Sequence, residues 1–448
     1  MNRIEDQEVL VVQGTEFKRF EGVSAPPLNP SKKGVWSHEM TEVAAKPSAD
    51  RKKPQLPALS GLRLFVALHI YVFHIMQAHQ AGLLKFAVLD ALPSQLGLLL
   101  RRGFVSTGLF FQLSGLLLAY AYLDASGRPS VPDREFWWGR FVRLYPLYLL
   151  SLVLLVPAPA LLPITAKPTT LGSMLGMVVT NLTLTQAWFP AYAVAWNSPA
   201  WALSAFAMFY TVFPFAARWI AGCDRTRLRV SLIAMVLLSL FPVIAFLIAD
   251  PEGNAWTATS VTVGGFWLNV LRFDPLVWLP QFLSGLVLGR LISLEVDAGA
   301  ATFQQVSRPW VSAGDLGVAA LVLLLSCWSE IPYVLLRHGL LVPITLAILA
   351  DLARGRGLMA RALSWPWFGR LSEAGFGLFA LQMPIGVWLV FVTLRSAEGT
   401  TAQLAVLIAT TLVGAILWTE AVQRPLLQRH RRSNPAPSVI RKGITSRC

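Results

Sequence analysis

Residues 59–79 read LSGLRLFVALHIYVFHIMQAH, an apolar stretch long enough to cross a bilayer as a single helix. Nine further stretches of this kind follow before residue 423. Hydrophobic residues make up 55% of the 448 and charged residues only 14%, whereas a soluble domain has about 25% charged residues. The sequence therefore predicts an all-α fold, a polytopic bundle of transmembrane helices.

The ten predicted spans are 59–79, 103–122, 144–162, 200–218, 229–249, 276–290, 313–333, 336–352, 374–394 and 402–422. Residues 171–190 are also apolar, but Asn181 and Gln186 make them more polar than a lipid-facing helix. A span here would also place the basic segment 218–229 outside the cell. We therefore interpret residues 171–190 as a re-entrant or interfacial segment, with an eleventh span as the alternative.

Lys and Arg are distributed unequally between the two sides of this scheme. With the N-terminus inside, 30 of the 38 lie in cytoplasmic segments, seven lie outside, and Arg63 lies within the first span. This is the bias of the positive-inside rule, and it predicts a multi-pass protein of the inner (plasma) membrane with both termini cytoplasmic. The net charge of +14 does not indicate nucleic acid as a partner, because the basic residues flank apolar runs.

Three regions follow from composition. Residues 1–58 are polar, charged and rich in proline, and we expect a disordered cytoplasmic tail. Residues 59–428 form the transmembrane domain, and residues 429–448 form a basic cytoplasmic tail. No cleavable signal peptide opens the chain, and the three cysteines have no metal-like spacing, so no metal site is predicted.

Two ionisable residues in the first span are candidates for function, because such groups are costly inside a membrane. Arg63 and His74 are 11 residues apart, so they share one helix face at roughly 16 Å along the axis. Arg63 lies near the cytoplasmic mouth and suits a phosphate, while His74 lies deeper and suits a general base. The alternative is a snorkelling arginine and a packing histidine. His69 and His79 are interpreted as structural.

The motif Arg63-x10-His74 after Leu-Ser-Gly-Leu resembles the opening of the acyltransferase-3 family of integral membrane O-acyltransferases. That family includes bacterial enzymes that acetylate O-antigens, exopolysaccharides and Nod factors. Five later segments resemble its further motifs in the expected order: GFVSTGLFFQLSG at 103–115, RFVRLYPLY at 140–148, WNSPAWALS at 196–204 with FY at 209–210, LPQFLSG at 279–285 and FGLFALQMP at 376–384. The resemblance covers roughly residues 57–428.

The resemblance implies an acyl-CoA donor, acetyl-CoA in the simplest case, as co-substrate and no permanently bound cofactor. It implies a hydroxyl of a cell-envelope glycan or lipid-linked sugar as acceptor, with membrane lipid around the bundle. The implied site residues are His74 and Arg63 for catalysis, Arg140, Arg143 and Tyr148 for the donor, and Ser114, Asn197, Trp201, Ser204, Tyr210 and Gln382 for the acceptor cavity. Taken alone, Ser114 fits helix packing, Arg140 and Arg143 fit flanking charges, and Trp201 fits an interfacial aromatic residue.

The sequence departs from the family at three positions. Phe206 and Ala207 stand where the family has an acidic residue, Gln382 stands where many members have His, and Gln423 stands where Glu is frequent. A histidine base works best when a second group fixes its tautomer, so another partner must do this for His74. The sequence offers four candidates: a backbone carbonyl, Asn197, Gln382 or Asp274.

The leading hypothesis is therefore an O-acyltransferase in which His74 deprotonates the acceptor hydroxyl. A transporter or flippase of a related glycan or lipid is the first alternative, because the same polar interior would move a substrate without chemistry. A catalytically inactive scaffold that acts through its tails is the second. Transfer of acetyl from labelled acetyl-CoA in inside-out vesicles separates the enzyme from both.

Overall fold

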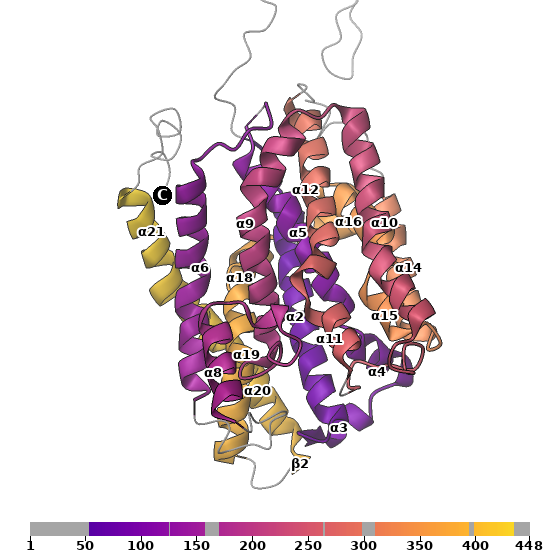
Figure 1. Cartoon of the computed structure of the whole chain (residues 1–448), viewed down its shortest axis with the longest axis vertical. Helices are drawn as coiled ribbons and strands as arrows, with labels where there is room; N and C mark the ends of the chain where they lie inside the picture. The colour runs from indigo at the N-terminus through magenta and orange to yellow at the C-terminus, as the bar shows by residue number, and fades with distance from the viewer. Residues whose placement is uncertain are drawn as a thin grey trace, which may run out of the picture. The chain divides into compact units, whose positions relative to one another are not determined.

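The computed structural model describes residues 53–124, 126–156, 170–262, 265–297, 310–393 and 398–433. These residues form a helical bundle with one short pair of parallel strands (Figure 1). The predicted all-α fold is confirmed. Most of the two predicted tails lies outside the described residues.

The longer helices are α2 (Pro57–Gln80), α5 (Val105–Tyr122), α6 (Asp133–Leu154), α9 (Trp201–Ala221), α10 (Arg225–Ala249), α12 (Pro275–Asp297), α19 (Gly375–Thr393) and α20 (Thr401–Trp418). The shorter ones are α3 (Ala87–Asp90), α4 (Ser94–Arg101), α8 (Leu171–Leu182), α11 (Phe266–Phe273), α14 (Ala313–Cys327), α15 (Tyr333–Arg337), α16 (Val342–Ala353), α17 (Gly357–Leu363), α18 (Pro366–Ser372) and α21 (Arg424–Ser433). Strand β1 (Lys85–Phe86) pairs in parallel with β2 (Glu398–Gly399).

Each of the ten predicted spans overlaps a helix within the described residues. Within the described ranges, seven helical stretches are long and apolar enough to cross a membrane, and α18 with α19, bent by 52°, makes an eighth. The other two predicted spans correspond to α6, whose first half carries arginines, and to α14, which has only 15 residues. Helix α8 has 12 residues, about 18 Å, which is short for a complete span and favours the re-entrant or interfacial interpretation over an eleventh span.

Helices α5 and α12 lie side by side at the centre of the bundle (Figure 1). Glycines allow this contact: a Cβ at Gly285 would lie 1.9 Å from the carbonyl oxygen of Gln112, and one at Gly115 would lie 2.1 Å from that of Phe282. Small residues at such a contact let two backbones approach closely. Helix α2 packs against α5 of this pair and also against α18 and α19.

Lys53 joins the start of α2 to the ends of the central pair. Its ammonium group donates to the carbonyl oxygens of Tyr120 (3.1 Å) and Leu123 (2.7 Å) and to Ser293 Oγ (3.2 Å). Helix C-termini leave such carbonyls without partners. The start of α2 therefore lies at the same end of the bundle as the C-termini of α5 and α12.

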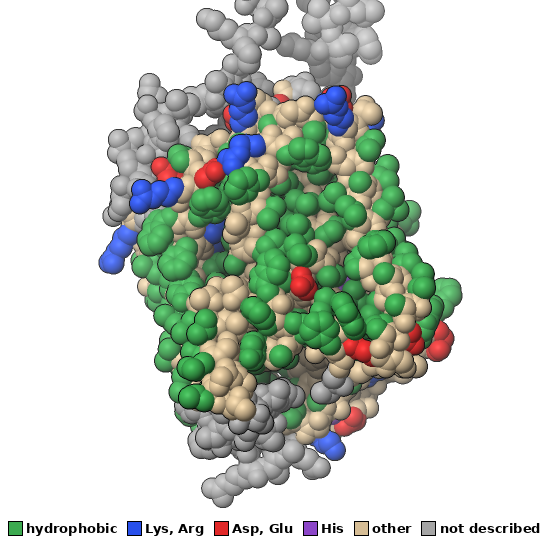
Figure 2. All heavy atoms as spheres, viewed as in Figure 1, with side chains coloured by type: hydrophobic (Ala, Val, Ile, Leu, Met, Phe, Trp, Pro, Cys, Tyr) green, Lys and Arg blue, Asp and Glu red, His purple; other side chains and the backbone are tan. Residues whose placement is uncertain are grey.

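We call this the basic end, because on the face shown in Figure 2 most Lys and Arg lie there. Hydrophobic side chains cover the flank below it (Figure 2). On α10, for example, Phe241 is 70% exposed and Ile248 is 80% exposed. An apolar flank this extensive requires lipid around it, and together with the spanning helices it makes the chain a multi-pass membrane protein.

The glycine contact generates a stability prediction. Gly285→Val should destabilise the protein by more than about 3 kcal/mol, the upper range of ordinary overpacking, because the neighbouring atom is a backbone carbonyl. Thermal unfolding of the detergent-solubilised protein measures this. Gly222→Val is the matched control, since a Cβ there meets nothing within 4 Å; equal unfolding temperatures for the two variants would contradict the packing argument.

Candidate active site

Helix α2 carries three histidines, and two of them use both ring nitrogens within the bundle. His69 Nδ1 lies 2.8 Å from Ser106 Oγ, and its Nε2 lies 3.1 Å from the carbonyl oxygen of Leu99. A carbonyl only accepts, so Nε2 carries the proton and Nδ1 accepts from the hydroxyl. His79, at the end of α2, is also bonded at both nitrogens. The geometry gives both residues structural roles.

His74 is bonded differently. Its Nδ1 lies 3.0 Å from Gln382 Oε1, and Gln382 Nε2 donates to the carbonyl oxygen of Phe379 at 2.9 Å. The second bond sets the orientation of the amide, so Nδ1–H must be the donor to Oε1. Among the described residues, Nε2 has no hydrogen-bond partner and keeps its lone pair. Of the four tautomer-fixing candidates in the sequence, Gln382 is the one in contact with His74.

Arg63 belongs to a cluster of like charges that bridges α2 and α6. The charges of Arg143 and Arg140 both act on its guanidinium group. No hydrogen bond or ion pair joins Arg63 or Arg143 to another residue of the described ranges. Glu373 attracts both from further away, but its carboxylate is paired with Arg424 at 2.8 Å. Like charges gathered in this way repel one another, and an anion relieves the repulsion.

Aromatic rings hold the third guanidinium of this cluster. Arg140 donates to the hydroxyl of Tyr122 and lies 4.8 Å from the centre of that ring, 5.4 Å from Phe136 and 5.7 Å from Tyr210. Such contacts orient a cation without neutralising it. Tyr210, predicted for the acceptor cavity, therefore lies within the basic cluster.

Two other predicted residues connect α6 to the segment that follows it. Tyr148 donates its hydroxyl hydrogen to the carbonyl oxygen of Asn181 (2.7 Å) and accepts from Gln186 Nε2 (3.3 Å). Asn197 Nδ2 donates to Ser151 Oγ (2.9 Å). These buried bonds position α8 and the loop before α9. A donor-binding role for Tyr148 and an acceptor role for Asn197 stay predictions.

The remaining predicted acceptor residues do not meet around one opening. Ser204 is fully buried, and its hydroxyl accepts weakly from the backbone N–H of Ala187 (3.4 Å). Trp201 is buried among other aromatic rings. Ser114 is half-buried on α5 beside the glycine contact, where it fits helix packing. Gln382 alone of these residues contacts His74.

Arg337 is a residue that the sequence analysis missed, because it was counted as a loop charge outside the membrane. It is 7% exposed, and its charge acts on His74. Its Nη2 donates to the carbonyl oxygen of Arg272 (3.1 Å), whereas its Nε has no partner in the part of the chain that the structure describes. In the structure the helical stretch runs from Tyr333 to Ala353, which places Arg337 further inside it than the predicted span 336–352 did and makes it a candidate intramembrane cation.

Comparisons with known proteins identify a family for this chain. A family model described as "Acyltransferase domain" matches residues 56–419. The relatives found include the acyltransferase MdmB of Streptomyces mycarofaciens, 29% identical over 60% of this chain and 65% of that protein. The putative peptidoglycan O-acetyltransferase YrhL of Bacillus subtilis (strain 168) is 24% identical over 74% of this chain and 48% of that protein.

The chain thus spans about two thirds of the first relative's length and about half of the second's. A third relative, protein 2 in the picA locus of Rhizobium radiobacter, is 32% identical over 30% of this chain and 76% of that protein. No solved structure matches. Because the family model covers most of the chain and takes in both the Arg63–His74 motif and the basic cluster, the protein belongs to the acyltransferase-3 family.

Proposed function

We propose that this acyltransferase is an O-acetyltransferase of the inner membrane, with both termini in the cytoplasm. It transfers acetyl from acetyl-CoA to a hydroxyl of a cell-envelope glycan or lipid-linked sugar. The observation that carries the proposal is the bond from His74 Nδ1 to Gln382, which leaves Nε2 as the basic nitrogen. The putative peptidoglycan O-acetyltransferase among the relatives supports acetyl as the group and an envelope glycan as the acceptor.

The basic cluster fits the donor. Acetyl-CoA carries its phosphates at one end and its thioester at the other. A site for it therefore needs cations at the depth of the phosphates and the base at the depth of the thioester. Arg63 and Arg143 offer charges without carboxylate partners among the described residues, and Arg140 is held beside them by aromatic rings. Guanidinium groups bind phosphate oxygens bidentately. His74 lies eleven residues further along α2, roughly 16 Å from Arg63 along the axis.

The proposed reaction is direct transfer. His74 Nε2 removes the proton of the acceptor hydroxyl while the hydroxyl oxygen attacks the thioester carbonyl. The C–S bond then breaks, and the CoA thiolate takes the proton from the imidazolium. Gln382 Oε1 accepts from Nδ1–H throughout and stabilises the imidazolium as its charge develops. An amide does this less strongly than the carboxylate of other histidine catalysts.

The orientation of the protein in the membrane is part of the proposal. The basic end holds Lys53, the start of α6 and the Arg218–Asp133 ion pair. Under the positive-inside rule this end faces the cytoplasm, where acetyl-CoA is found. The acceptor then reaches His74 from the opposite end of the bundle.

Replacing the proposed base tests the function directly. His74→Ala should lower acetyl transfer by about 10²- to 10⁴-fold, the usual contribution of a general base, with normal expression. Transfer of label from acetyl-CoA in inside-out vesicles and the mass of envelope glycans measure it. His69→Gln, which changes a bonded histidine on the same helix, is the control. If His74→Ala transfers acetyl at the wild-type rate, the assignment of His74 as the base is rejected. If the wild-type protein leaves acetyl-CoA unchanged, a transporter is favoured.

The role of Gln382 is tested separately. Gln382→Leu should lower kcat by about 10- to 100-fold, because a hydrogen bond to a charged group contributes about 1.5–3 kcal/mol, with little change in KM for acetyl-CoA. Gln77→Leu removes another amide bond of α2, the one to the carbonyl oxygen of Ser260 (2.7 Å) in the loop between α10 and α11, and controls for lost packing. Equal losses in both variants would leave Gln382 without a special role.

The basic cluster makes a different kinetic prediction. Arg143→Gln should raise KM for acetyl-CoA by about tenfold or more, because one charge-assisted bond to phosphate is lost, and should affect kcat less. Arg218→Gln, at the same end but paired with Asp133, should leave KM within twofold. An unchanged KM in Arg143→Gln would remove this residue from the donor site.

A further inference from the structure

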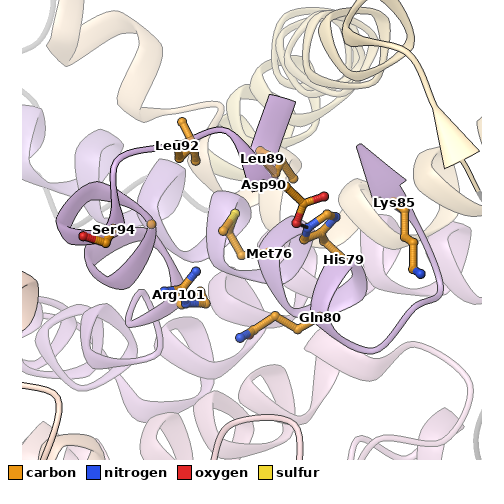
Figure 3. A pocket seen from close by; sticks show the side chains of 10 residues that line it. Met76, His79, Gln80, Lys85, Leu89, Asp90, Leu92, Ser94 and Arg101 are labelled. Atoms are coloured by element: carbon orange, nitrogen blue, oxygen red, sulfur yellow. Dashed lines mark hydrogen bonds and ion pairs between the residues drawn. The ribbon is translucent and has the colours of Figure 1, made fainter. Parts of the chain in front are cut away.

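A cavity of about 530 Å³ lies at the end of the bundle opposite the basic end. Its walls come from the last turns of α2, from β1, from α3 and the loop after it, and from α4 (Figure 3). This volume is within the range of small-molecule sites, about 300–1,000 Å³. None of the residues predicted from sequence as donor or acceptor residues lines it, so the cavity has no assigned ligand. We call it the far-end pocket.

His79 and Asp90 meet inside the far-end pocket (Figure 3). His79 Nε2 donates to Asp90 Oδ1 at 2.9 Å, and its Nδ1 accepts from the backbone N–H of Phe86 at 3.2 Å. With both nitrogens used, the ring has no lone pair for a substrate proton. Asp90 Oδ2 has no hydrogen bond to another described residue and remains an acceptor. The pair therefore suits binding of hydroxyl groups and not catalysis.

Two cations face the same pocket, Lys85 from β1 and Arg101 from α4. Neither has an ion-pair partner among the described residues, so the two cations outnumber the one carboxylate. Gly97 makes space for one of them, because a Cβ there would lie 3.1 Å from Arg101 Nη1. An anionic group on the ligand would compensate the excess positive charge.

Apolar side chains complete the wall, among them Met76 and Leu89. A sugar residue presents hydroxyls at its edge and C–H groups on its faces, so it needs hydrogen-bonding groups and apolar contacts together. The far-end pocket offers both, with Gln80 and Ser94 as further polar groups. A lipid phosphate alone would use the cations, but it would bring no hydroxyl to the free acceptor oxygen of Asp90.

We propose that the far-end pocket binds an anionic sugar residue of the acceptor glycan. The inference rests on the proposed function and specifies its substrate class. Met76 comes two residues after His74 on α2 and His79 comes five after, about 7.5 Å along the helix axis. A glycan whose acidic residue occupies this pocket therefore approaches the base from the side opposite the basic cluster.

Binding of defined sugars to the full-length protein in nanodiscs tests the proposal, with equilibrium dialysis as the measurement. Cellobiouronic acid carries a carboxylate that its neutral analogue cellobiose lacks. We expect the acid to bind at least tenfold more tightly, and increasing salt should reduce the difference. Glucose 6-phosphate shows whether a phosphate serves as well as a carboxylate.

Variants then locate the binding site. Lys85→Gln and Arg101→Gln should each weaken binding of cellobiouronic acid by about tenfold and leave cellobiose unchanged, and Lys85→Arg should retain binding. Arg218→Gln, at the basic end, is the matched control for loss of one positive charge. Equal affinity for the acidic and neutral disaccharides, or no effect of either variant, overturns the proposal. Binding of phosphatidylglycerol vesicles that depends on Lys85 and Arg101, with no measurable sugar binding, also overturns it, because the cations would then serve lipid.

Different measurements would reject the proposed sugar pocket and the proposed acetyltransferase function. His74→Ala should bind cellobiouronic acid as the wild-type protein does, because the pocket does not use the imidazole. Acetyl transfer to envelope glycans by the wild-type protein, with no preference for the acidic disaccharide, rejects only the pocket. Sugar binding without any acetyl transfer rejects the enzyme and leaves a sugar-binding membrane protein.

Discussion

The contact between α5 and α12 places the backbones of the two central helices so close that side chains at Gly115 and Gly285 would overlap carbonyl oxygens of the opposite helix. Inside a bilayer no water separates helices, and close packing of small residues is what holds them together. Helix α2 packs on α5, and Lys53, just before α2, bonds near the C-termini of both α5 and α12. The positions of the groups along α2 therefore depend on how α5 and α12 meet.

Chemical character changes along α2 in an ordered way. The first turns bring a guanidinium beside two others from α6, the middle presents an imidazole to an amide on α19, and the last turn borders a polar pocket. One helix thus carries a cation, an imidazole and part of a polar pocket at three depths. This arrangement suits a reaction whose two substrates arrive from opposite sides of a membrane, because neither substrate has to cross it.

The sequence predicted the helical bundle and the shared face of Arg63 and His74 well, since both depend only on local periodicity and apolar length. The acceptor cavity stays a prediction, and the structure shows where its residues lie. Trp201 and Ser204 lie in packed interior, and Tyr210 lies with the arginines. Arg337 was overlooked because it stands at the second residue of the predicted span 336–352 and was counted with the charges outside the membrane, and helix ends are the least reliable part of such an analysis.

The sequence by itself determined that the chain spans a membrane repeatedly, which end of the bundle is rich in positive charge, and that an arginine and a histidine lie eleven residues apart on one helix. Hydrophobic runs and charge counts suffice for these, because transfer into lipid is close to additive along the chain. Only the tertiary structure decided that Gln382, 308 residues away, holds His74, and that α2, β1, α3 and α4 enclose a pocket. Side chains distant in sequence meet through helix packing, which no local pattern encodes.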